Sequence, residues 1–155
     1  MRPAQRPGAS KQDYGTPPEF LRAVEARFGA ITHDLAARAD NRVAPGFFGP
    51  EQDSIVQDWT ALTGTLWLNP PFGRVAPWAA KCQRSKGPNR RIVMLTPAAV
   101  GTEWFAESVY GHARVYALRP RITFVGTRDP YPSDLMLSVY CTELPPALCL
   151  WRWYR

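Results

Sequence analysis

Short runs of consecutive apolar residues constrain the fold of this 155-residue chain more than any other feature of its sequence. The clearest run is Ile-Val-Met-Leu at 92–95, and further strand-like segments occur at 67–68, 115–118, 122–125 and 135–140. A strand that is apolar on both faces is typical of a parallel sheet covered by helices, because a strand with one wet face alternates apolar and polar residues. Since helix-like segments separate these runs, the sequence predicts an α/β fold with a mostly parallel sheet.

Three segments carry helix signals. In the first, Thr16 is expected to be the N-cap, Pro17 the first helical residue and Glu19 the partner of Thr16 in a capping box. Gly29 is expected to end this helix. The other two predicted helices are shorter, at 77–83 and 103–110.

The two ends of the chain also carry signals. A short strand is expected at 30–34, directly after the first helix. The last two strands, at 136–141 and 148–154, are joined by a Pro145-Pro146 turn and are expected to pair antiparallel at one edge of the sheet. The length of the chain fits one domain, and residues 1–12 read as a flexible basic arm in front of it.

The charge balance of the chain favours an anionic partner. Nineteen Lys and Arg against thirteen Asp and Glu give a net charge of +6, so nucleic acid is the first partner to consider. No stretch approaches the ~20 apolar residues of a membrane span, and no apolar run follows the basic N-terminus, so we expect a cytoplasmic protein without a membrane partner. Three cysteines without CxxC spacing and two isolated histidines predict neither a disulfide framework nor a metal site.

The most informative motif follows the segment at 67–68, where Asn69, Pro70, Pro71 and Phe72 form an Asn-Pro-Pro-Phe turn. Ligands of an open α/β sheet bind beyond the carboxyl ends of its strands, which is where this turn is expected. Two successive prolines fix φ and remove two N–H donors, so the turn is stiff and leaves free acceptors. The Asn69 amide oxygen and the Pro70 carbonyl can then accept both hydrogens of an exocyclic amine whose ring stacks on Phe72.

This arrangement suits the methylation of a planar amine. The lone pair of adenine N6 or cytosine N4 is delocalised into the ring, and drawing both hydrogens toward acceptors favours a pyramidal nitrogen whose lone pair can reach an electrophile. Methyl transfer from a sulfonium depends mainly on such positioning and on electrostatics. A strand-terminating turn without any ligand is the alternative explanation of these four residues.

Several motifs follow one another between Tyr14 and Tyr140: YGTPPEF, HDLAARADN, EQDSIVQDW, LWLNPPFG, IVMLTPAAVGTEWF, RPRITFVG and DPYPSDLML. In this order they resemble the N6-adenine DNA methyltransferases of phages and prophages, the Dam-like family. The resemblance implies a Rossmann-like class I methyltransferase sheet, reduced in size and with an antiparallel edge. It also implies a single catalytic domain over 13–155, S-adenosylmethionine as the cofactor, and transfer of a methyl group to adenine N6 in DNA.

The resemblance assigns roles to individual residues. The turn from Asn69 to Phe72 becomes the catalytic motif, in agreement with its chemistry. Cofactor contacts are implied for Tyr14, Thr16, Pro17, Asp34, Ala36, Asn41 and Asp53. Asp34 would face the methionine ammonium, and Asp53 would hydrogen-bond the cofactor adenine or ribose. Helix capping is the alternative role of Thr16 and Asp34.

The chain departs from the family pattern in two places. After Asp34 come Leu-Ala-Ala-Arg, so the glycine-rich cofactor loop of methyltransferases is absent, and the next glycine is Gly46. The late motif begins with Asp129, where the family commonly has a small apolar residue. Tyr131 in this motif is expected to be the second face of a clamp on the target base, opposite Phe72.

Phosphate contacts are expected from basic residues around the turn. The stretch between Trp59 and Thr102 contains no Asp or Glu, and its run RSKGPNRR resembles a phosphate-gripping loop. DNA contacts are predicted for Arg74, Arg84, Lys86, Arg90 and Arg91, with Arg119, Arg121 and Arg128 as a second rim. A solvated loop is the alternative. Because a base inside a duplex cannot reach the turn, the target must be extruded or single-stranded.

Several alternatives stay open from the sequence. An Asn-Pro-Pro-Phe turn also suits cytosine N4 and the amide of a protein glutamine, although the acid-free stretch weighs against a protein substrate. The missing glycines leave room for a nucleic-acid-binding protein that has kept the fold and lost turnover. The chain is too short for a separate target-recognition domain, which predicts a short or weakly specific recognition sequence. Monomer and homodimer are equally compatible with the sequence.

Overall fold

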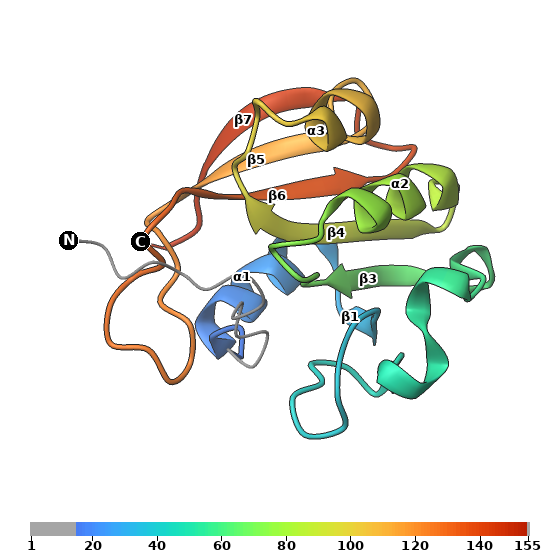
Figure 1. Ribbon diagram of the computed structural model, residues 1–155, viewed down its shortest axis with the longest axis horizontal. Coiled ribbons are helices and arrows are strands. Elements are labelled where there is room, and N and C mark those ends of the chain that lie inside the picture. Colours follow the sequence, from blue (N-terminus) through green and yellow to red (C-terminus); the bar gives the residue numbers. More distant parts are fainter. Residues whose placement is uncertain (1–14, 155) are drawn as a thin grey trace.

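Residues 15–154 of the computed structural model build one mixed sheet with helices on both faces (Figure 1). The strands are β1 (Ile31–Asp34), β2 (Gly46–Phe47), β3 (Gly64–Leu68), β4 (Arg90–Pro97), β5 (Arg114–Arg119), β6 (Leu135–Tyr140) and β7 (Ala147–Arg152). The helices are α1 (Pro18–Phe28), α2 (Ala76–Ser85) and α3 (Glu103–Ser108), and the short 3-10 helices η1 (Pro50–Gln52), η2 (Ser54–Val56) and η3 (Trp59–Ala61) connect β2 to β3. The predicted α/β class is confirmed, while the basic arm at 1–12 lies outside the described residues.

The strands follow the order β2-β1-β3-β4-β6-β5-β7. Strands β2, β1, β3 and β4 run parallel, whereas β6 is antiparallel to both of its neighbours, β4 and β5. The expected Rossmann-like sheet, mostly parallel with antiparallel pairing toward one edge, is confirmed. The predicted hairpin of the last two strands is wrong, because β7 pairs in parallel with β5, which separates it from β6. Strand β6 is buried on both faces and needs a central place, whereas β7 alternates in burial and suits an edge.

The two faces of the sheet carry separate cores. Val93 and Leu95 of β4 pack on the face covered by α1, whereas Ile92 and Met94 pack on the face covered by α2 and α3. Figure 1 shows α2 and α3 together on one side of the sheet. Both faces of β4 are therefore buried, which explains the uninterrupted apolar run in its sequence.

Helix α1 begins one residue later than predicted. Pro17, not Thr16, is the N-cap, and no side chain caps this helix. Either of the two prolines after Thr16 suits the first helical position, so the sequence allows two registers. Thr16 is buried instead. Gly29 ends the helix as predicted, with a φ of 102° that favours glycine.

The segment 122–125 is not the strand that the sequence predicted. It belongs to the loop at 120–134, which joins β5 to β6. Ile122 and Phe124 are buried in the core on the α1 face, and the Ile122 carbonyl accepts a hydrogen bond of 2.8 Å from the Tyr131 amide. The apolar residues of this segment therefore serve packing from a loop, without a partner strand.

Parallel pairing decides which motifs share an edge of the sheet. Asp34 at the end of β1 is aligned with Trp67 of β3, and Asn69 follows directly after β3. At the other end of β3, Gly64 is aligned with Arg90, the first residue of β4. The turn at 69–72 and the run at 84–91 therefore lie at opposite edges of the sheet.

Candidate functional site

A cavity of about 500 Å³ lies at the edge where β1 and β3 end. Its wall is built from residues 15–16, from the segments 34–43 and 48–54, from the end of β3 with the turn after it, and from Trp78 of α2. The predicted residues on this wall are Thr16, Asp34, Ala36, Asn41, Asp53, Asn69 and Pro71. The structure thus brings predicted cofactor residues and predicted catalytic residues into one cavity, of a size that suits a small-molecule ligand.

Asp34 is the buried charge of this cavity. Its side chain ends β1 and is 4% exposed. One carboxylate oxygen accepts a hydrogen bond from the Ala36 amide (3.3 Å) and the other from the Val43 amide (3.1 Å). Burial raises the pKa of Asp34 to about 6, although these two hydrogen bonds act in the opposite direction. The carboxylate therefore shapes the segment 35–43 and places a negative charge at the cavity wall.

The glycines of the cavity come from places other than the loop after β1. Gly15 and Gly49 line the cavity beside Ala36 and Ala37. A Cβ atom on Gly49 would lie 3.1 Å from the Gln52 side-chain oxygen, which accepts a hydrogen bond of 2.6 Å from the Gly49 amide. Two segments that are distant in sequence thus provide the small residues that the loop after Asp34 lacks.

The remaining predicted cofactor residues have different surroundings. Asn41 accepts a hydrogen bond from the Arg38 amide at 2.7 Å and so stabilises the bend that follows β1. Asp53 is exposed, with a φ of 47° in the left-handed region. Pro17 is buried at the start of α1 and does not line the cavity. Tyr14 lies outside the described residues.

Three aromatic residues of the cavity wall were not predicted as site residues. Trp67, in the predicted strand at 67–68, is 1% exposed yet reaches the cavity wall. Trp78 stacks on Trp59, with an interplanar angle of 24° and ring centroids 6.3 Å apart. Phe48 follows the two-residue strand β2, which is too short to leave a periodic signal in the sequence. Its position beside Phe47, where two adjacent aromatic residues stand between Gly46 and Gly49, is the signal that could have identified it.

The Asn-Pro-Pro-Phe turn presents unpartnered acceptors. Among residues 15–154, no donor forms a hydrogen bond with the Asn69 side chain or with the Pro70 carbonyl. The Pro71 carbonyl accepts a hydrogen bond of 3.0 Å from the Arg74 amide, which closes the turn. Asn69 and Pro71 line the cavity, whereas Pro70 is buried behind them. Of the predicted pair of acceptors, the Asn69 side chain is therefore available at the cavity, whereas Pro70 is not part of its wall.

Phe72 and Tyr131 meet as the sequence predicted, but not as two parallel faces. Their ring centroids are 5.4 Å apart and their planes form an angle of 82°. Phe124 contacts both rings, so the loop at 120–134 rests on the turn. Val125 of this loop also donates a hydrogen bond of 2.9 Å to the Gly15 carbonyl, at the cavity wall.

The basic run at 84–91 is not near the turn. It joins α2 to β4 at the opposite edge, and the five residues of β3 place the two edges about 16 Å apart. Lys86 donates to the His112 carbonyl (2.8 Å), Arg90 to the Ser85 carbonyl (2.6 Å) and Arg91 to the Phe28 carbonyl (2.6 Å). The expectation that this loop surrounds the turn is wrong, because the loop leads into the start of β4 whereas the turn follows the end of the neighbouring parallel strand β3. A DNA contact of these residues stays a prediction.

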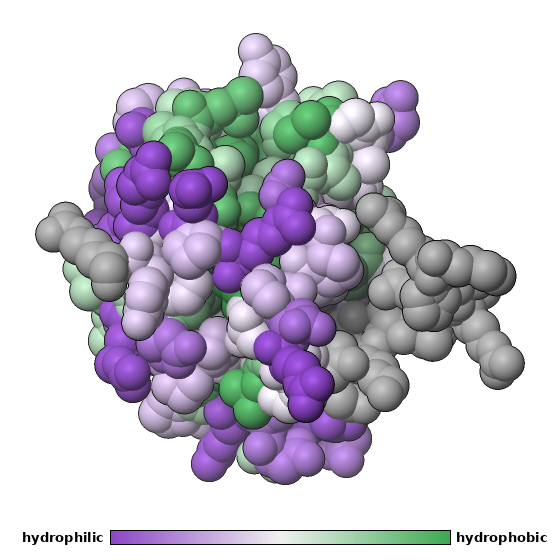
Figure 2. Space-filling model, turned by 90° about the vertical axis from the view of Figure 1, so that its left-hand side faces the viewer, coloured by the Kyte–Doolittle hydropathy of each residue, from purple (hydrophilic) through white to green (hydrophobic). Residues whose placement is uncertain are grey.

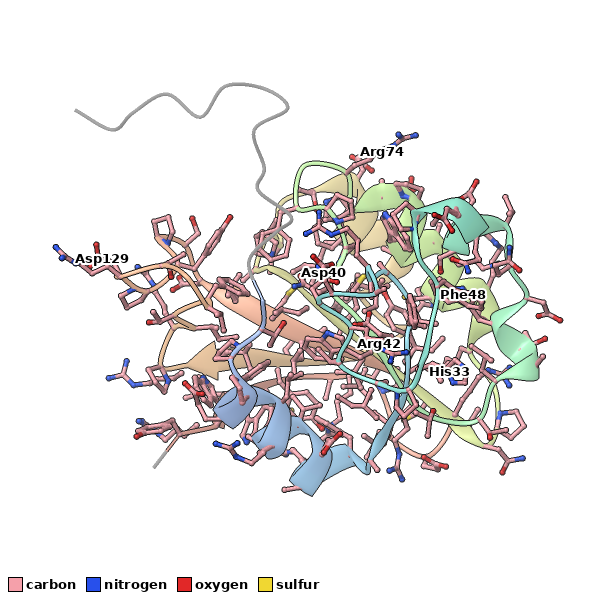
Figure 3. The ribbon with its side chains drawn as sticks, turned by 90° about the horizontal axis from the view of Figure 1, so that it is seen from below. His33, Asp40, Arg42, Phe48, Arg74 and Asp129 are labelled. Atoms are coloured by element: carbon pink, nitrogen blue, oxygen red, sulfur yellow. The ribbon has the colours of Figure 1, made fainter. Side chains whose placement is uncertain are left out.

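Arg74 is the predicted cation that does lie beside the turn. It is exposed, and its side chain has no hydrogen bond or ion pair with residues 15–154. Figure 3 shows Arg74 pointing away from the molecule, and Asp129 at the far end of the loop at 120–134. In the predicted second rim, Arg121 forms an ion pair with Asp134 at 3.0 Å.

The face seen in Figure 2 is the side of the molecule on which β3 and β4 end in Figure 1. Hydrophilic residues extend across its middle and lower parts, and apolar residues gather toward the top. Two arginines that the sequence did not single out lie in the segment after β1: Arg38 forms an ion pair with Asp40 at 3.4 Å, and the Arg42 guanidinium lies 5.0 Å from the ring centroid of Phe47.

The described residues were also compared with the requirements of a metal site and of a membrane span. Within the described part of the chain, no group of three or more His, Cys, Asp or Glu side chains is placed to hold a metal ion. None of the described helices combines the length and the apolar character that crossing a membrane requires.

Comparison with known proteins finds one matching family and relatives from phages. The family model described as DNA N-6-adenine-methyltransferase (Dam) matches residues 4–135. A DNA N-6-adenine-methyltransferase of Escherichia phage T1 is 30% identical over 117 residues, which cover 76% of this chain and 49% of that protein. A DNA N-6-adenine-methyltransferase of Haemophilus phage HP1 is 28% identical over 103 residues, 65% of this chain and 58% of that protein. The chain thus spans about half the length of the curated relatives it matches.

Proposed function

The chain belongs to the DNA N-6-adenine-methyltransferase (Dam) family, and from that premise we propose that it transfers a methyl group from S-adenosylmethionine to the exocyclic N6 of adenine in DNA. One observation carries the proposal. The Asn69 side-chain amide, which has no hydrogen-bond partner among residues 15–154, stands at the wall of a cavity that also contains the buried Asp34 carboxylate. With relatives from phages, the protein is proposed to act on DNA in the cytoplasm of a bacterial host.

The residues of the cavity fit S-adenosylmethionine. The buried Asp34 carboxylate suits the methionine ammonium, and the polar groups of Thr16, Asn41 and Asp53 suit the hydroxyl and amino groups of the nucleoside. The rings of Phe48 and Trp78 offer apolar wall for the purine. When bound, the cofactor supplies an electrophilic methyl group on a sulfonium.

The turn prepares the amine of the target base. The Asn69 side-chain oxygen and the Pro70 carbonyl accept its two hydrogens, which favours the pyramidal nitrogen with an available lone pair. Because two prolines stiffen the turn, these acceptors are held in place before the base arrives, and little reorganisation is needed during the reaction. The base ring stacks on Phe72, next in the same turn.

DNA is proposed to approach the edge where β1, β3 and β4 end. A base within a duplex must leave the stack to reach Asn69, whereas a single strand can enter directly. Arg74 is two residues beyond Phe72 and exposed, and it has no partner within the described part of the chain, so it can contact a phosphate next to the extruded base.

The proposal is tested with DNA from a methylation-free host. The purified protein is incubated with this DNA and S-adenosylmethionine, and the digested nucleosides are analysed by mass spectrometry. We expect N6-methyladenine from the wild type. We expect at least a 100-fold smaller amount from Asn69→Ala, with cofactor binding retained, because the amine loses a positioned acceptor.

The exposed Thr142→Ala, in the turn after β6 at the opposite edge, is the matched control and is expected to behave as the wild type. N4-methylcytosine as the product would keep the mechanism and change the base. No methylated nucleoside, with cofactor binding intact, would favour a protein glutamine as the substrate. Absence of cofactor binding would leave a nucleic-acid-binding protein without turnover, and full activity of Asn69→Ala would remove the mechanism.

A further inference from the structure

Phe72, Phe124 and Tyr131 form an aromatic cluster beside the Asn-Pro-Pro-Phe turn. We infer that Tyr131 is a positioning residue: together with Phe124 it fixes the ring of Phe72 on which the target base stacks, and it is not a second face against that base. The inference rests on the proposed function and concerns how the base-binding ring of that site is held.

The angles within the cluster distinguish a support from a clamp. A base held between two rings needs those rings nearly parallel and about 7 Å apart, because stacked aromatic planes are separated by about 3.4 Å. Phe72 and Tyr131 instead form an angle of 82°, with centroids 5.4 Å apart. Phe124 meets Tyr131 at 87° and Phe72 at 64°. Each ring thus contacts the others edge to face, and their own atoms fill the space between them.

Phe72 needs such support. The prolines before it fix the backbone of the turn, but its half-buried side chain keeps the rotational freedom of χ1 and χ2. Edge-to-face contacts from two directions remove that freedom before any base binds. A ring that is already fixed loses less conformational entropy when a base stacks on it, so the base is held more tightly beside Asn69.

Tyr131 is well placed to act as a support because its loop is anchored. Its amide donates to the Ile122 carbonyl at 2.8 Å, and the Val125 amide donates to the Gly15 carbonyl at 2.9 Å. The Tyr131 hydroxyl has no hydrogen-bond partner among residues 15–154, and burial raises its pKa. The ring, and not the hydroxyl, therefore makes the contact that matters.

A double-mutant cycle of Tyr131→Ala and Phe72→Ala tests the inference. Two quantities are measured. The first is the single-turnover rate of methyl transfer to a duplex. The second is the fluorescence emission of 2-aminopurine in a duplex where it replaces the target adenine, which increases when the base leaves the stack. We expect Tyr131→Ala to lower both, the rate by about 10-fold. Tyr131→Phe keeps the ring and should restore both. In the Phe72→Ala background, Tyr131→Ala should cause no further loss, because it acts through Phe72.

Equal losses from Tyr131→Ala in the two backgrounds would overturn the inference, since Tyr131 would then touch the base itself. Tyr131→Leu, which fills the volume without a ring, and thermal unfolding of each variant separate positioning from loss of the fold. The exposed Tyr110→Ala is the control and should leave both quantities unchanged. A wild type that neither transfers a methyl group nor extrudes the base would remove the proposed function together with this inference.

Discussion

The two edges of the sheet use their polar groups in opposite ways. At the edge where β3 and β4 begin, Lys86, Arg90 and Arg91 all donate hydrogen bonds to backbone carbonyls. At the edge where β3 ends, the Asn69 amide and the Arg74 guanidinium have no partner among residues 15–154. These three cations are satisfied within the fold, whereas Asn69 and Arg74 are free for ligands as far as the described residues are concerned.

The difference follows from the α/β fold. The helices that connect parallel strands end at the edge where the next strand begins, and helix ends carry free carbonyls and partial negative charge. Arg91 binds the carbonyl of Phe28, the last residue of α1, and Arg90 binds that of Ser85, the last residue of α2. These cations therefore complete the fold, and a basic run in an α/β sequence is not by itself a phosphate site.

The pH dependence of stability provides the largest expected effect. Burial raises the pKa of Asp34 to about 6 from an ordinary 3.8. Between these values the folded chain binds a proton that the unfolded chain has lost, so the Asp34 contribution to stability falls by about 3 kcal/mol as the pH rises from 4 to above 6. Affinity for S-adenosylmethionine should rise over the same pH range, because the deprotonated Asp34 carboxylate attracts the methionine ammonium. Urea unfolding and cofactor titration of wild type and Asp34→Asn at several pH values test this, and a difference that does not vary with pH would contradict it.

Arg90→Ala should affect stability and not the site. The side chain donates to the carbonyls of Ser85, Thr60 and Pro88, so its loss removes three hydrogen bonds, one of them at the end of α2. We expect the free energy of unfolding to fall by about 2 kcal/mol, with cofactor affinity unchanged. A variant with full stability would break the contrast between the edges.

Arg74→Ala should lower affinity for DNA and leave stability unchanged. Because this exposed side chain has no partner among the residues that the structure describes, the free energy of unfolding should stay within about 0.5 kcal/mol of the wild type. Affinity for a fluorescent duplex at low salt should fall about 3- to 10-fold, with the salt dependence reduced by about one counterion. Unchanged affinity and salt dependence would remove Arg74 from the proposed DNA surface.

The smallest effect is expected from Arg84→Ala. Arg84 is exposed at the edge away from the cavity and has no partner in residues 15–154. Neither stability nor duplex affinity should change measurably, as for most surface substitutions. A loss of affinity as large as that of Arg74→Ala would mean that DNA also reaches this edge, as the sequence had suggested.

Local patterns predicted much of the fold and the centre of the site. The apolar runs at 92–95 and 135–140 identified two buried strands, because burial on both faces leaves no polar alternation. Asn69 could be singled out because two prolines make the chemistry of the turn readable from four consecutive residues. Ile122 and Phe124 were misassigned because an alternating apolar pattern is the same for a strand and for a loop that packs on a core.

The sequence by itself determined the class of sheet, the stiff turn with its two acceptors and the acid that ends β1, because each depends on neighbours along the chain. Only the tertiary structure decided that Gly15 and Gly49 meet at one cavity, that Tyr131 meets Phe72 edge to face, and that the basic run lies at the far edge. These facts depend on strand order and on which end of a strand a loop joins. Long-range pairing sets both, so no local pattern could contain them.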